Sequence, residues 1–472
     1  MRNDAQKYPS FAAEIKAIDE GGITTDILSK ILQKHTANAD YNRDLYKRYQ
    51  CVDGAVPISK REPEHVDSEV KPINNKVNND FFSEIIDFKT GYFAGRPISY
   101  SYSDTKESED MTGGDGAVDE ATKALTDFVT RNNMFDIDME TTKFASICGY
   151  AGRLFYIDGE GNERVMNVPG YEAIILSNTS ITEPKYAVRY YSTQNIDGKE
   201  TWHVEFYDDS TIKIYEGDLS APTLIEKRPH LFDYCPLQGV PNNEEMLGDA
   251  EKVLALIDDY DKVLSDNSNE IESFVHAIMA IENINIADEE IRKMQSTGAL
   301  QYHSGANQGK IYFVTKDIND AFTEHHMERL ESNIYRFSKT PNLGDESFGA
   351  ASGVSLRFKL TGLEAKCGMF QAKVLSAGTY MFKLLASSWT KRRIMIDPLQ
   401  CVMEFSRNSP LDAVSEAQTV QALIAAGLPK EVAFSQLSFV DDVDYVMALL
   451  EKEQSGIPPL DEDVEGDDSG EV

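Results

Sequence analysis

No stretch of this sequence approaches the roughly 20 consecutive apolar residues that a membrane-spanning helix needs. The first residues, Met1-Arg2-Asn3-Asp4, lack the apolar core of a signal peptide. Cysteine is scarce, with 5 in 472 residues, widely spaced and without a Cys-x-x-Cys pair. We therefore expect free, packed thiols in a reducing compartment and no membrane partner.

Basic residues are also few, since 46 lysines and arginines face 79 acidic residues and leave a net charge of −33. Proteins that hold nucleic acid tightly are normally basic, because affinity comes from neutralising phosphates. The composition argues against tight DNA binding. It still allows a passage for DNA, because an acidic wall repels phosphate and leaves a duplex free to slide.

Signature motifs of catalysis are missing as well. Gly309-Lys310 is followed by Ile311 and has no earlier glycine at the spacing of a phosphate loop, and no His-Glu-x-x-His zinc motif occurs. His325 and His326 between Glu324 and Glu328 are better explained as a solvated helix face than as a metal site. We predict no catalytic residue, no metal and no cofactor.

The amino-terminal half alternates between helical and strand patterns. Apolar residues recur at helical spacing after the cap candidates Thr24 and Thr25, and again over 77–93, where Lys89 lies on the inner face. We expect a strand at 98–102, an exposed loop at 104–119, and two helices that divide near Asn132-Asn133. Five strands are predicted between 153 and 226: 154–157, 172–176, 186–190, 202–206 and 212–215.

The carboxyl-terminal half is mainly helical. A coiled-coil-like seam predicts a helix over 249–278, about 45 Å long, with a polar break at Asn267. The seam consists of Val253, Ile257, Tyr260, Leu264, Asn267 and Ile271, and continues to Ile278. A strand pair, 300–303 with 310–314, and a helix over 317–338 follow.

Beyond a loop rich in small residues, a long helix is expected over 355–393. Its interior glycines, Gly362, Gly368 and Gly378, predict bends or close packing. A strand at 400–405, helices over 411–454 and a disordered acidic tail complete the prediction. The fold class is therefore α+β and mainly helical.

Five segments resemble the portal proteins of long-tailed bacteriophages, in sequence and in order. They are Asn75–Phe82, Gly91–Ile98, Cys148–Ala151, Leu256–Lys262 and Ser352–Leu360. The resemblance implies a β-rich wing, two stem helices, a small α/β clip, a long glycine-bent helix and a helical crown. The implied divisions are wing 1–240, first stem helix 241–278, clip 279–316, second stem helix 317–338, tunnel loop 339–353, long helix and returning wing strand 354–410, crown 411–454, and tail 455–472.

The same resemblance implies a function and partners. Twelve copies would form a ring at one vertex of the virion capsid, assembled in the host bacterial cytoplasm, with no enzymatic activity. Partners would be the terminase large subunit, a head-completion (adaptor) protein, the major capsid and scaffolding proteins, and double-stranded DNA passing without sequence specificity. The tunnel-loop residues facing DNA would be Lys339, Asn342, Asp345, Glu346, Ser347, Gly349, Ser352 and Gly353.

Alternatives remain open from the residues alone. Lys339 can instead cap the helix that precedes it, where a cation is favoured. The whole chain can be another head–tail connector or a scaffold component, although adaptors are usually much shorter. A metal-dependent nuclease built on the acidic clusters is the third alternative.

Overall fold

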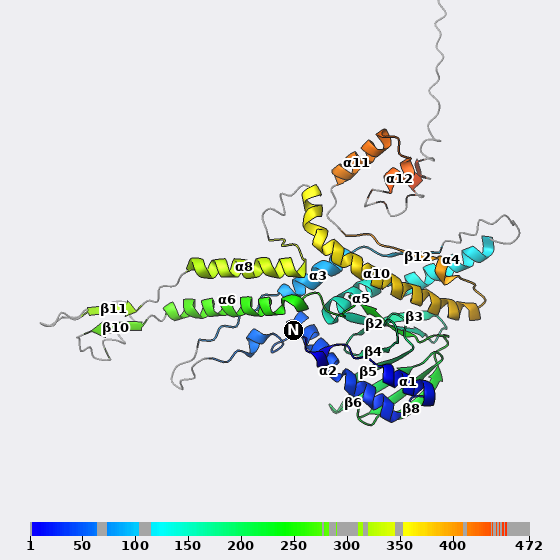
Figure 1. The fold of residues 1–472 in the computed structure, drawn as a ribbon, viewed down its shortest axis with the longest axis horizontal. Helices are drawn as coiled ribbons and strands as arrows, with labels where there is room; N and C mark the ends of the chain where they lie inside the picture. The colour runs from blue at the N-terminus through cyan, green and yellow to red at the C-terminus, as the bar shows by residue number, and fades with distance from the viewer. Residues whose placement is uncertain are drawn as a thin grey trace, which may run out of the picture.

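The computed structural model describes residues 2–63, 73–102, 115–275, 278–282, 310–314, 320–344, 353–408 and 413–435, with isolated positions at 289 and between 437 and 450. Two sheets and their covering helices form the body, and a pair of long helices projects from it (Figure 1). No helix in these ranges is long and apolar enough to cross a membrane. The fold class is α+β, as predicted.

The first helices cover the larger sheet. Helix α1 spans Ala12–Gly21 and α2 spans Thr25–Tyr49, after a short 3-10 turn, η1 (Asp4–Gln6). Thr24 is the N-cap of α2, because its hydroxyl accepts from the Ile27 amide at 3.3 Å. Their apolar faces pack on the sheet in one core cluster, which includes Phe11, Ile15, Leu28, Ile31, Ile174, Val188, Val204 and Phe206.

The antiparallel sheets contain more strands than the sequence predicted. The larger sheet has the order β4 (Ala173–Leu176), β5 (Tyr186–Gln194), β6 (Glu200–Tyr207), β7 (Thr211–Gly217), β8 (Thr223–Pro229). The smaller has the order β3 (Glu163–Pro169), β2 (Tyr150–Ile157), β9 (Leu237–Pro241). Strands β3, β8 and β9 were missed. Strand β9 contains glycine and proline, and β8 is exposed throughout and shows no alternation of buried and exposed side chains.

Helices α3 and α5 pack on each other, α5 also packs on β2, and α4 packs on β1 (Ser99–Tyr102). Helix α3 spans Phe81–Ala94, and the prediction that it starts at Val77 was wrong, because Asp80 caps it and the preceding residues are extended. Helix α4 spans Asp115–Arg131, so the predicted loop at 104–119 ends by Asp115; its earlier residues lie outside the described ranges. Asn133, in the left-handed region with φ of 47°, separates α4 from α5 (Met134–Cys148), as predicted.

The long helix α10 spans Gly353–Lys391 and packs its buried side on α3, on β9 and on β12 (Cys401–Glu404). Strand β12 pairs antiparallel with β1 (Ser99–Tyr102), 300 residues away in the chain. A Cβ added at Gly378 would lie 2.2 Å from the Met403 Sδ, so close packing explains that glycine. Gly368 differs, since an added Cβ would meet no heavy atom of the described structure within 4 Å.

The projecting pair consists of α6 (Leu254–Val275), entered through a 3-10 turn at Glu251–Val253, and α8 (Asp320–Ser338). The expected helix to Ile278 is too long, because Ile278 begins β10 (Ile278–Glu282), which pairs with β11 (Lys310–Val314). The predicted partner of β11, 300–303, lies outside the described residues, and the observed partner is β10. Two short helices, α11 (Ala413–Ala425) and α12 (Lys430–Phe434), end the described chain apart from isolated positions, and the acidic tail lies beyond it.

Candidate functional site: the projecting helix pair and its junction with the long helix

Helices α6 and α8 pack side by side and lead to the antiparallel strand pair β10–β11 (Figure 1). The predicted seam is buried at its base, where Val253 and Ile257 are 0% and 1% exposed. Tyr260 and Leu264 are half-buried, the Asn267 amide lies 3.6 Å from the Met327 sulfur on α8, and Ile271 is 66% exposed. The pair is therefore anchored in the body and becomes more exposed toward its far end.

The pair is acidic. Helix α6 carries six carboxylates and one lysine, and α8 carries four carboxylates and two arginines. His325 contacts Glu328 at 3.3 Å and His326 contacts Asp259 at 3.6 Å, all on exposed or half-exposed positions. Within the described residues, no group of three or more His, Cys, Asp or Glu side chains could hold a metal ion. The surface as placed can repel phosphate.

An extended segment before α3 follows α6 and is bonded to it one helical turn at a time. The Asn79 amide and side chain both donate to the Asp261 Oδ1, at 2.8 and 2.9 Å, and the Val77 amide donates to the Ser265 hydroxyl at 2.9 Å. The Asn75 amide donates to the Asn269 side chain at 2.6 Å. Sequence analysis missed this role; the four asparagines among residues 74–79, poor helix formers, were the available signal.

The segment between α8 and α10 holds the predicted tunnel-loop residues, of which the structure describes three. Lys339 follows α8 in the left-handed conformation (φ 60°), is exposed, and lies beside Gly362 of α10. The Thr340 amide donates to the Tyr335 carbonyl at 3.1 Å, which closes the helix end in a Schellman arrangement. The Asn342 side chain donates to Glu331 at 2.9 Å and accepts from the Gly344 amide.

The remaining tunnel-loop residues fall in two groups. Gly353 is the first residue of α10 rather than part of a loop. The others, Asp345, Glu346, Ser347, Gly349 and Ser352, lie outside the described residues. The structure therefore brings Lys339 and Asn342 together at the α8 end.

A buried ion cluster joins α3 and α10 to the segment that enters α6. Asp249 lies 2.8 Å from the Lys89 ammonium and 3.2 Å from that of Lys366, and the Asn242 side-chain amide donates to the Asp249 carboxylate at 3.2 Å. Burial acts to raise the pKa of Asp249, but the two ammonium groups outweigh it and hold that pKa well below its usual value. Burial lowers the pKa of Lys89, which also lies 4.4 Å over the Phe370 ring. The prediction that Lys89 faces inward was correct, but its partners were not predicted.

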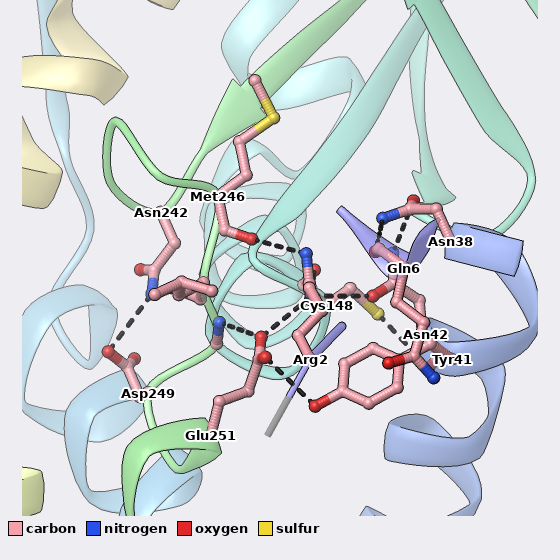
Figure 2. Close-up of polar contacts among 12 residues, drawn as sticks. Arg2, Gln6, Asn38, Tyr41, Asn42, Cys148, Asn242, Met246, Asp249 and Glu251 are labelled. Atoms are coloured by element: carbon pink, nitrogen blue, oxygen red, sulfur yellow. Dashed lines mark hydrogen bonds and ion pairs between the residues drawn. The ribbon is translucent and has the colours of Figure 1, made fainter. Parts of the chain in front are cut away.

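A second buried junction centres on Glu251, at the base of α6 (Figure 2). Its carboxylate accepts from Arg2 at 2.9 Å, from the Tyr41 hydroxyl at 3.2 Å and from the Gly248 amide at 2.6 Å. Arg2 also donates to the Met246 and Cys148 carbonyls. Burial raises the pKa of Glu251 against the attraction of Arg2. The two junctions fix the base of the projecting pair to α2, α3, α5 and α10.

Comparison with known proteins decides the family. The family model "Phage portal protein, SPP1 Gp6-like" matches residues 28–459. The chain belongs to this family. It is 24% identical to the portal protein of Bacillus phage SPP1 over 95% of this chain and 90% of that one. It is 23% identical to the portal protein of Clostridium phage phiCD119 (strain Clostridium difficile/United States/Govind/2006), over 87% of this chain and 90% of that one.

Membership in the portal family accounts for the resemblance found in the sequence. The match begins within α2 and runs past α12, so it includes both sheets, the projecting pair and the long helix. Two of the segments that carried the resemblance have a structural explanation. Asn75–Phe82 contains the extended segment that is hydrogen-bonded to α6. Cys148–Ala151 forms the turn from α5 into β2, where Gly149 adopts a φ of 85° beside the Met246 carbonyl.

Proposed function

We propose that copies of this chain form a closed, dodecameric ring at one capsid vertex, through which double-stranded DNA enters during packaging and leaves at ejection. The observation that carries the proposal is the portal-family match across residues 28–459. The portal family is structural, and the work of moving DNA would come from the ATPase of the packaging motor.

The helix pair suits the role of a stem in such a ring. In this proposal, α6 and α8 line the channel. The region 279–316, around β10 and β11, forms the clip. The terminase large subunit and later the head-completion protein dock to this clip. Residues 1–240 form the wing, with β12 returning to it, and 411–454 form the crown. The major capsid and scaffolding proteins would surround the ring, which assembles in the host cytoplasm and remains in the virion.

The charge of the pair supports passage rather than capture. Its two helices carry ten carboxylates and three basic residues, so phosphate is repelled and few counterions would be released by contact. Lys339, exposed at the end of α8, is the basic group we assign to transient contact with the DNA backbone. The loop 339–353 would then be the tunnel loop.

Shortening this loop tests the proposal. Removing Gly349 to Ser352 leaves α10 intact, so we expect normal rings, many times 52.8 kDa by light scattering, and normal incorporation into proheads. DNA packaging or retention should fall. Removing the acidic tail, 461–472, serves as the control and should change neither.

The outcomes separate the two parts of the proposal. Full-length packaging with normal retention in the loop-shortened particles would contradict the tunnel-loop assignment alone. An unaltered chain that remains a monomer, with no ring in images viewed down the symmetry axis, would contradict the portal function.

A further inference from the structure

The long helix α10 presents one uncharged face to solvent along its middle. Between Thr361 and Thr379 every exposed position is uncharged, in a chain of which 26% of residues are charged. These positions recur at the helical period and define what we term the long-helix face: Thr361, Gly362, Ala365, Gly368, Met369, Ala372, Leu375, Ser376 and Thr379. At about 1.5 Å per residue the face is about 27 Å long.

Large apolar side chains lie on this face. Met369 is 54% and Leu375 38% exposed, and Phe358, one turn before the face, is 77% exposed. The opposite side of the same helix is core, where Leu363 and Phe370 are fully buried. Exposed apolar side chains that gather on one side of a helix are typical of interaction sites.

The charged side chains of this part of α10 are engaged within the chain. Lys366 pairs with Asp249 at 3.2 Å, Lys373 pairs with Glu244, and Glu364 pairs with Arg407 at 3.1 Å. The nine positions of the face therefore carry no charge themselves, and the ionic groups beside it are the half-exposed Glu364 carboxylate, which pairs with Arg407, and exposed Lys339, which lies beside Gly362. A DNA duplex would need lysine or arginine there, because phosphate contacts supply most of its affinity.

Gly368 is an independent reason to expect close approach from outside. Apart from proline, glycine is the least favourable residue in a helix interior. Among the residues that the structure describes, none comes within 4 Å of a Cβ built at Gly368, so packing within the chain does not explain it. Because Gly368 is exposed in the middle of the long-helix face, unlike the half-buried Gly91 of α3, a neighbouring molecule that lies directly on the helix backbone would explain it.

We propose that the long-helix face is where one copy of this chain packs against the next, an inference that rests on the ring of the proposed function. Two copies of charge −33 repel each other, so contact is least costly where neither like charges nor unpaired charges meet. The centres of protein interfaces are depleted of charged residues. A closed ring needs a heterologous contact, so the face meets a different surface of the neighbour.

Placing one negative charge in the centre of the face tests the proposal. We expect Ala372→Glu to abolish the ring, leaving a 52.8 kDa species in sedimentation velocity with an unchanged far-ultraviolet circular dichroism spectrum. Ala13→Glu is the matched control, because Ala13 is also an exposed alanine in a helix, α1. Chains with Ala13→Glu should still form rings.

A second variant adds only a methyl group. Gly368→Ala should weaken ring assembly at least tenfold, while alanine's helix preference raises the thermal midpoint of the unassembled chain by about 1–2 °C. Gly91→Ala, in α3, is the control: its added Cβ also meets no described heavy atom within 4 Å, and it should leave assembly unchanged. Because Gly368→Ala favours the helix, loss of folding cannot explain a loss of assembly.

Each result has one meaning. Rings that tolerate both Ala372→Glu and Gly368→Ala would overturn the interface and leave the portal function standing. Rings that form with Ala372→Glu but package less DNA would show that the face meets DNA, and would also overturn it. An unaltered chain without rings would overturn both proposals.

Discussion

His35 is a fully buried histidine whose two ring nitrogens lie 3.0 Å from the Tyr190 hydroxyl and 2.9 Å from the Tyr150 hydroxyl. Burial lowers its pKa from 6.5 to about 3. The folded chain thus keeps the ring neutral at pH values where the unfolded chain protonates it. The stabilisation is complete above pH 6.5 and is lost progressively as the pH falls toward 3.

His35→Gln removes this titration while keeping a polar side chain. At pH 5 the difference in pKa costs the wild-type fold about 2 kcal/mol relative to pH 7. We therefore expect the thermal midpoint of the wild type to fall more between pH 7 and pH 5 than that of the variant. Parallel curves for the two proteins would contradict a neutral, buried His35.

Asp249 and Glu244 provide a matched pair of tests, because both pair with lysines of α10 but differ in burial. Asp249→Asn leaves Lys89 and Lys366 without their shared counterion in the interior, which should destabilise the fold by about 3–5 kcal/mol. Glu244, whose side chain is 82% exposed, should tolerate Glu244→Gln with almost no change in urea unfolding. Equal effects would show that burial does not set the strength of these contacts.

Among the elements, those with a periodic apolar pattern were predictable and those without one were not. The apolar spacing located α2, α10 and the strands β2 and β4 to β7. Strand β9 was missed, since Gly239 and Pro241 are untypical of strands; Ile181 packs so closely that a Cβ added at Gly239 would lie 2.7 Å from its side chain. Arg2 and Glu251 are 249 positions apart, so no local pattern relates them. The end of α6 was displaced for the same reason, because Ile278 pairs with Val314 of β11.

The extended segment on α6 gives an element-level test. Asp261→Ala removes the acceptor shared by the Asn79 amide and side chain and leaves a half-buried amide unpaired, which should cost about 1–3 kcal/mol in urea unfolding. Lys262→Ala, its exposed neighbour on the same helix, is the control and should be close to neutral. A neutral Asp261→Ala would mean that the segment is held by other contacts.

Substitutions of Lys339, at the end of α8, distinguish the two roles considered for it, contact with DNA and capping of the helix. In the left-handed conformation a non-glycine residue is strained by about 1–2 kcal/mol. Lys339→Gly should therefore be more stable than Lys339→Ala, although both lose the charge. If the ammonium group contacts DNA, both variants should reduce DNA retention in particles equally. If DNA retention instead falls more in the less stable variant, Lys339→Ala, the role of Lys339 is at the helix end alone.

For the whole molecule, charge and assembly oppose each other. A chain of net charge −33 that packs through an uncharged face should assemble better when salt screens repulsion. The Debye length falls from about 30 Å at 0.01 M salt to about 8 Å at 0.15 M. We expect the fraction of chain in rings to rise over this range in sedimentation velocity; dissociation by added salt would indicate an interface held by ion pairs.

The bonds between residues 75–79 and α6 also set how the molecule bears load. Their acceptors, Asp261, Ser265 and Asn269, are spaced four residues apart along one helix, and the donors follow in an extended chain beside it. A pull along the helix axis strains all of these bonds together in shear, whereas a pull across the axis breaks them one at a time. Helix α6, tied to the segment in this way, is mechanically stiff along its own length and compliant sideways, so pressure directed down the axis is transmitted into the body while lateral displacement peels the segment away.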